Sequence, residues 1–194
     1  MSANLKHRDQ CVSAANKALS CLGRLKQTFV SRDKTLWLLL YKTYIRPHLE
    51  YCAPAWSPYL KGDIDILEKV QRKATKIPTS LKHMEYTDRY RVLGLDSLEN
   101  RRIRTDIITF YKIVHSINTV NWVKQLTKAN PRGRSGFKFI RELNTRDSRH
   151  FFFTNRTIAI WNTLNEEEYT NAPSVQVLKS NLNKLDLVEM ANKH

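Results

Sequence analysis

Glycine and proline are scarce in this sequence, with 5 and 6 copies among 194 residues. All-β folds and low-complexity linkers need these residues at short intervals, so the shortage disfavours both classes. Helices need them mainly near their ends. We therefore expect a mainly α fold of helices with one short extended segment near 137–143.

Cysteine is also scarce, and its three copies, Cys11, Cys21 and Cys52, form no Cys-x-x-Cys pair. An odd number of distant cysteines is typical of reduced thiols, so we expect an intracellular protein of the nucleus, the cytoplasm or both. His48 and Cys52 are four residues apart, a spacing that can place two metal ligands on one helical face. No second pair accompanies them, so we predict no metal site and no cofactor in this chain.

Long hydrophobic runs are absent as well. The most apolar run, 36–41, lies between Lys34 and Lys42. It is far shorter than the roughly 20 residues that a membrane-spanning helix requires. Residues 1–10 show no secretory signal. The sequence therefore predicts no membrane partner.

Acidic residues are outnumbered, because 33 Lys and Arg residues stand against 18 Asp and Glu residues, a formal net charge of +15. Such an imbalance favours a polyanionic partner. The 41 % of hydrophobic residues is enough for a chain of this length to bury a core of its own.

Apolar residues recur at intervals of three and four along most of the chain, the period of one helical face. The pattern is strongest over 98–117. Ser31 and Ser174 are placed to cap helices through their hydroxyls, and Gly94 suits the left-handed residue that often follows a helix end. We predict helices at about 3–30, 31–45, 64–77, 87–93, 98–117, 148–164 and 174–185.

The predicted helix 64–77 has an apolar face and a cationic edge. The edge consists of Lys69, Arg72, Lys73 and Lys76, which are spaced at i, i+3, i+4 and i+7. These four are the first candidates for contact with nucleic-acid phosphates. A second candidate group lies on the predicted helix 98–117 and consists of Arg101, Arg102, Arg104 and Lys112. The alternative for both groups is an ordinary solvated helix face.

The most basic part of the chain is 124–156, in which nine Lys and Arg residues stand against two acidic ones. Arg132 and Arg134, in its glycine-rich loop, are further candidates for nucleic-acid contact. Phe137, Phe139 and Phe151 are interleaved with these cations, and bases can stack on aromatic rings. The alternative is that the aromatic residues 151–153 and Trp161 fill a small C-terminal core.

Several strings occur in an order and at spacings that resemble one known family along most of the chain. They are LYKTYIRPHLEYC (40–52) followed by WSP (56–58), LEKVQRKAT (67–75), RYRVLGL (89–95), SLENRR (97–102) and WNTL (161–164). The family is that of the reverse transcriptases of non-LTR retrotransposons of the LINE type, including Jockey-like elements. The resemblance is to the thumb and the region downstream of it.

The resemblance implies a fragment of an RNA-directed DNA polymerase that grips the template-primer duplex of RNA and DNA. The family's palm holds magnesium ions with paired aspartates, and such two-metal chemistry requires the carboxylate pair. No Asp-Asp pair occurs in this sequence. We therefore expect no catalytic residue and no enzyme activity of the chain alone, with the parent's palm and fingers as its protein partners.

The expected organisation is a thumb-like helical region at 1–120, a basic linker or loop at 121–147 and a small helical subdomain at 148–194. Three functional classes remain open from the residues. The first is a nucleic-acid-binding module, and the second is a domesticated or decaying helical scaffold without a nucleic-acid role. The third, an independent enzyme, is disfavoured by the missing aspartate pair.

Overall fold

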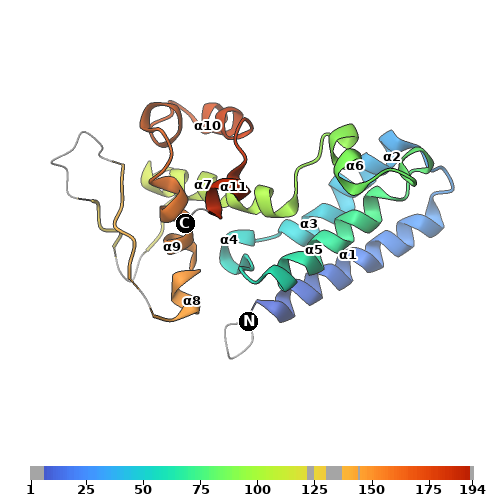
Figure 1. Ribbon diagram of the computed structural model, residues 1–194, viewed down its shortest axis with the longest axis horizontal. Coiled ribbons are helices and arrows are strands. Elements are labelled where there is room, and N and C mark those ends of the chain that lie inside the picture. Colours follow the sequence, from blue (N-terminus) through green and yellow to red (C-terminus); the bar gives the residue numbers. More distant parts are fainter. Residues whose placement is uncertain (1–6, 122–124, 130–136, 144, 193–194) are drawn as a thin grey trace. The chain divides into compact units, whose positions relative to one another are not determined.

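The computed structural model describes residues 7–121, 125–129, 137–143 and 145–192. It is 66 % helical, which confirms the predicted mainly α fold. Among the described residues the β pairing is one isolated antiparallel bridge, between Lys128 and Phe139. The chain divides into two compact units, Met1–Arg101 and Arg102–His194, called unit 1 and unit 2 below (Figure 1).

Unit 1 is a bundle of helices joined by short connections. Its elements are α1 (Arg8–Thr28), α2 (Lys34–Leu40), the π-helix η1 (Tyr41–Ile45), α3 (Arg46–Glu50), α4 (Ala53–Trp56), α5 (Lys61–Thr75), the 3-10 helix η2 (Thr79–Leu81), α6 (Tyr86–Leu93) and the beginning of α7 (Leu98–Val114). The long helices α1 and α5 run side by side (Figure 1).

Small residues allow α1 to pack closely in this bundle. Ala14, Ala15 and Ala18 are 4 % exposed or less and lie on the same helical face as the buried Leu22. They share one hydrophobic core with Leu67 and other apolar residues of α5. The apolar residues that recur along this part of the sequence therefore form the face of α1 that packs against α5.

Two helix ends show how short polar side chains fix boundaries in unit 1. Asp33, and not Ser31, caps α2, because its carboxylate accepts hydrogen bonds from the backbone N–H groups of Thr35 at 2.7 Å and Leu36 at 3.3 Å. The prediction for Ser31 was wrong, and its hydroxyl instead accepts from the N–H of Asp33. Gly94 ends α6 with φ 56°, in the left-handed region, as predicted.

Proline widens one helix without ending it. Pro47 has no N–H, so the usual bond to the carbonyl four residues earlier cannot form. The N–H of Arg46 donates to the carbonyl of Tyr41, five residues back, and the π-helix η1 results. The helical path continues from α2 through η1 into α3, so Pro47, which was expected to kink the helix or to end it, does not end it.

In its described ranges, unit 2 contains the rest of α7 and five further helical segments. These are α8 (Asp147–His150), α9 (Phe153–Trp161), the π-helix η3 (Glu166–Thr170), α10 (Val175–Leu182) and α11 (Leu187–Ala191). The predicted helix 148–164 is thus interrupted between α8 and α9. Ser174 caps α10 as predicted, since its hydroxyl accepts from the N–H of Val177 at 3.3 Å.

Aromatic residues form the centre of unit 2. The ring of Phe110 contacts Phe139 and Trp161 edge to face, with centroids 5.4 and 5.0 Å apart. Asn162 fixes the extended segment to α9, because its side chain accepts from the N–H of Phe139 at 3.1 Å and donates to the same residue's carbonyl at 2.8 Å. Phe139 and Trp161 are therefore core residues, and for Trp161 the alternative stated above predicted this.

The division between the two units falls inside α7. Leu98 belongs to the core of unit 1, whereas Ile107, Phe110 and Tyr111 belong to that of unit 2. A helix with apolar residues in two cores gives no sequence signal at the boundary, since its period is continuous. The three-part division at 120 and 147 follows the expected parts of a polymerase, and it stays a prediction.

Candidate nucleic-acid interface

The basic edge of α5 is exposed along its whole length. Lys69, Arg72, Lys73 and Lys76 all lie at the surface, while Leu67 on the opposite face is completely buried. Arg72 and Lys73 occupy the last helical turn, where the helix dipole favours positive charge. The structure therefore brings together the first predicted group of cations as one edge of a rigid helix.

This edge borders a groove in unit 1 with a volume of about 540 Å³. Leu22 and Ile77 form its apolar part, and Thr79 adds a hydroxyl. Its remaining lining residues are all basic: Lys26 from α1, Arg32 from the loop after it, Lys73 from α5, Lys76 next to α5, and Lys82 following η2. Among the residues that the structure describes, no acidic side chain lines this groove, which is called the basic groove below.

Four of the five cations in the basic groove are available to a ligand. Lys26, Lys73, Lys76 and Lys82 are exposed. Within the part of the chain that the structure describes, none of them forms an ion pair with a carboxylate. Like charges around one hollow raise the local positive potential, which attracts a polyanion.

Arg32 has a different role in the groove. Its guanidinium donates to the carbonyl oxygens of Lys26 and Ser31 at 3.2 Å each, and to that of Phe29. It also lies over the ring of Trp37, 5.3 Å from the centroid. Arg32 thereby satisfies carbonyls in the last turn of α1 and just after it, where acceptors lack helical partners, and it adds positive charge without a free guanidinium.

Arg72 is held beside the groove by weaker contacts. Its guanidinium lies 4.0 Å from the carboxylate of Asp65 and 4.9 Å from the ring centroid of Tyr86. Both charged side chains of the pair are nearly half exposed, so the ion pair contributes little to stability. A phosphate can therefore compete for Arg72 at small cost.

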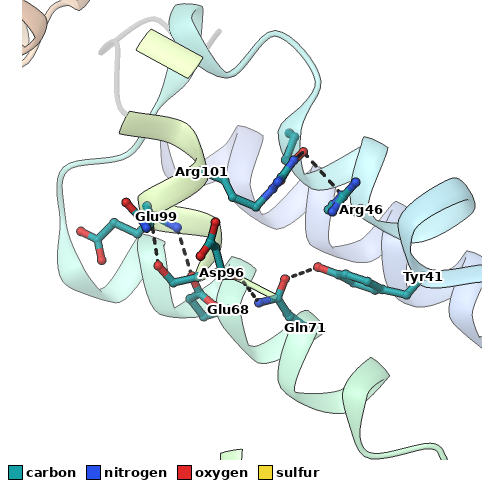
Figure 2. A network of polar contacts seen from close by, with 10 residues as sticks. Tyr41, Arg46, Glu68, Gln71, Asp96, Glu99 and Arg101 are labelled. Carbon is teal, nitrogen blue, oxygen red and sulfur yellow. Dashed lines mark hydrogen bonds and ion pairs between the residues drawn. The ribbon is translucent and has the colours of Figure 1, made fainter. Parts of the chain in front are cut away.

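The inner face of α5 is fixed by a network of polar contacts (Figure 2). Glu68, 6 % exposed, accepts hydrogen bonds from the hydroxyls of Tyr86 at 3.1 Å and Tyr90 at 2.9 Å, and from the N–H of Glu99 at 3.2 Å. Burial, together with the charge of Glu68, raises the pKa of Tyr86 above its ordinary value. The three donors tie α5 to α6 and to the first turn of α7.

A second contact of this network joins α5 to the π-helix. The hydroxyl of Tyr41 donates to Oε1 of Gln71, whose Nε2 donates to the carbonyl of Asp96 at 3.0 Å (Figure 2). Burial is the main cause that raises the pKa of Tyr41 above its ordinary value. The series of hydrogen bonds from Tyr41 through Gln71 to Asp96 fixes the inner face of α5. The basic edge on the outer face of α5 therefore has a rigid support.

The second predicted group does not form one exposed edge. Arg101 pairs with Glu50, with Nη2 and Oε2 3.0 Å apart, and this hydrogen bond raises the pKa of Arg101 (Figure 2). Arg102 is 1 % exposed, while Arg104 and Lys112 are half-buried. Their contact with nucleic acid stays a prediction, and for Arg102 it would require the side chain to leave its buried position.

Arg102 belongs instead to a buried charge cluster of unit 2. Asp106, 5 % exposed, pairs with Arg156 through two contacts of 2.8 and 3.2 Å. Burial raises the pKa of Asp106, and the positive charges of Arg156 and Arg102 oppose that rise. Arg132 and Arg134, the remaining predicted site residues, lie outside the described residues.

Sequence reasoning missed Lys26, Arg32 and Lys82 as members of the site. Each lies on a different segment from the basic edge of α5, and each is brought to it by the packing of α1 and of the chain after α5. Helical spacing finds cations on one helix only. The available signal was the excess of 15 positive charges, which points to a cationic surface without locating it.

Comparison with protein-family models, with curated proteins and with solved structures finds no match for this chain. In the described ranges, no three His, Cys, Asp or Glu side chains gather closely enough to hold a metal ion. The same ranges contain no helix with the length and apolar character needed to cross a membrane.

Proposed function

We propose that the chain binds the sugar-phosphate backbone of a template-primer duplex through the basic groove and the adjoining edge of α5. The observation that carries this proposal is the groove itself, in which Lys26, Lys73, Lys76 and Lys82 converge from three segments and no described acidic residue takes part in the lining. Phosphate contacts of this kind position a duplex and supply most of its affinity.

The chemistry of the groove suits binding that is independent of sequence. Lysine is a point charge on a flexible stem, whereas reading bases generally uses planar, bidentate groups such as a free arginine fork. Arg32, the arginine in the groove, is already engaged with carbonyl oxygens. A polymerase thumb must accept every sequence that passes, so this donor set fits such a role.

The resemblance supplies the biological setting of the proposal. In this proposal the chain is a piece of an RNA-directed DNA polymerase of a non-LTR retrotransposon, and it holds the template-primer duplex. The palm and fingers of the parent polymerase bind magnesium and form the new bonds. The missing Asp-Asp pair supports this division of labour. The chain alone is then not an enzyme.

Paired alanine substitutions test the groove. Lys73→Ala combined with Lys76→Ala removes two phosphate contacts, so we expect the affinity for a duplex of RNA and DNA to fall roughly tenfold at constant salt. The matched control is Lys61→Ala combined with Lys179→Ala, which removes the same charge from two exposed positions that do not line the groove. Fluorescence anisotropy of a labelled duplex measures both, and equal losses for the two variants would refute a role for the groove.

A further inference from the structure

Unit 2 contains a pocket of about 400 Å³, a volume within the range of ligand-binding pockets. The chain on either side of Leu126 lines one part of it, and Ile140 with Glu142 lines another. The remainder comes from Arg149 in α8, Phe152, and the first turns of α9. The proposed duplex binding by unit 1 makes no use of this pocket.

The ring of Phe152 provides an aromatic surface at the pocket. Phe152 is 45 % exposed, although its neighbour Phe153 packs against the core of unit 2. The guanidinium of Arg149 lies over the ring of Phe152, 5.2 Å from the centroid. Glu142 holds that guanidinium, with contacts of 2.9 Å to Nε and 2.6 Å to Nη2. The ring is thus presented to solvent on a fixed support.

A hydroxyl with no partner also lines the pocket. Thr154 is 8 % exposed, and within the described residues its hydroxyl forms no hydrogen bond. The neighbouring Thr157 and Thr163 instead donate to backbone carbonyls, at 2.6 and 2.7 Å. The hydroxyl oxygen is open to solvent in the pocket, since it is not among the buried unpaired side-chain atoms of the described residues, so a ligand can bond to it.

The polar groups across the pocket match the edge of a nucleobase. Asn121 and Gln125 line it, and amide side chains both donate and accept hydrogen bonds. Asn155, by contrast, is occupied, since it donates to the carbonyl of Arg149 at 2.9 Å and accepts from the N–H of Glu142. The available groups therefore offer mixed donors and acceptors beside an aromatic face.

Two cations lie on segments that adjoin the lining of this pocket. Lys128 follows a lining residue, and Arg146 precedes α8; both side chains are exposed. Within the described ranges neither forms an ion pair. A base held in the pocket would bring its flanking phosphates toward these cations, which favours a polyanionic strand over an uncharged ligand.

We infer that the pocket of unit 2 takes an unpaired base of single-stranded nucleic acid, stacked on Phe152 and bonded at its edge by Thr154. A duplex cannot enter in this way, because its base faces are covered by neighbouring bases, whereas single strands expose them for stacking on aromatic side chains. The inference goes beyond backbone binding by unit 1 and does not depend on it.

The test compares two single strands of equal length, one with bases and one built of abasic nucleotides, which share the same phosphates. Stacking of one base predicts that the full-length protein binds the strand with bases roughly 5- to 150-fold more tightly. Phe152→Leu keeps an apolar side chain but removes the aromatic face, so it should abolish most of this preference. Equal binding of both strands by the unaltered protein would overturn the inference, as would a preference that Phe152→Leu leaves intact.

Two further variants separate this site from other causes. Val177→Ala changes another exposed apolar residue of unit 2, on α10, and should leave the preference unchanged. Lys73→Ala combined with Lys76→Ala removes charge from the basic groove only, so it should leave the ratio of the two affinities unchanged. Loss of the preference in either variant would contradict a base site at Phe152.

Discussion

Tyr41 and Tyr86 place two phenol groups against the inner face of α5, where each donates to a buried side chain of that helix. Burial is the largest cause that raises the pKa of both above the ordinary 10.0. Ionisation would turn each hydroxyl from a donor into an acceptor facing Gln71 or the carboxylate of Glu68. At the residue scale, the support of the basic edge therefore depends on two protonated tyrosines.

The raised pKa values predict alkaline unfolding of unit 1. The folded phenols have higher pKa values than the unfolded ones, so their contribution to stability is fully present below pH 10.0 and is lost as the pH rises above it. Absorbance of phenolate and circular dichroism should then change together above that pH. If all eight tyrosines ionise near pH 10 with helicity intact, the buried network is not formed as described.

Tyr41→Phe tests one bond of the network at neutral pH. The substitution leaves Oε1 of Gln71, which is 0 % exposed, without its donor. We expect the free energy of unfolding to fall by about 1–3 kcal/mol. Tyr44→Phe is the control, because Tyr44 is 53 % exposed and its hydroxyl can bond water. Denaturant unfolding followed by circular dichroism measures both, and equal values for the two would contradict a buried hydrogen bond.

At the element scale, the pairing of α1 with α5 sets the shape of the groove. Alanines on α1 permit the close packing, and Leu22 and Lys26, further along the same helix, line the groove. A larger side chain in this contact would push the two helices apart. The geometry of the basic groove therefore depends on small residues that make no contact with a ligand.

Ala18→Leu tests that dependence. Ala18 is 0 % exposed, and overpacking a filled core typically costs about 1–3 kcal/mol of unfolding free energy. Ser20→Leu adds the same side chain to an exposed position of α1 and should change stability by less than about 0.5 kcal/mol. Thermal or denaturant unfolding measures the stability of both variants. An Ala18→Leu variant as stable as the unaltered protein would show that α1 and α5 are not closely packed at Ala18.

Much of the helical layout could be predicted from the sequence, because each helix carries its own apolar period. The edge of α5, the glycine that ends α6 and the cap of α10 are local features that involve residues within a few positions of one another. Features set by tertiary contacts were missed. Arg101 was a candidate for nucleic-acid contact because of its place on the predicted helix 98–117, but Glu50, 51 positions away, pairs with it. Lys82 likewise joins the groove through the packing of distant segments.

At the scale of the whole molecule, the two units carry different proposed chemistry. Unit 1 offers lysines around a groove and suits the backbone of a duplex, whereas unit 2 offers an aromatic platform and suits an unpaired base. If the chain belongs to a reverse transcriptase, as proposed, both kinds of nucleic acid would meet it, since a template is single-stranded ahead of the duplex. The net charge of +15 favours binding of a duplex and of a single strand alike, so composition alone does not distinguish the two kinds of binding.

The salt dependence of duplex binding tests backbone binding most directly. Each phosphate neutralised on a duplex contributes about −0.9 to the slope of log affinity against log salt concentration. If the four available lysines of the basic groove each neutralise one phosphate, the slope should be about −3.6, whatever the sequence of the duplex. A slope near zero, or an affinity that changes with sequence but not with salt, would contradict the proposed grip on the backbone.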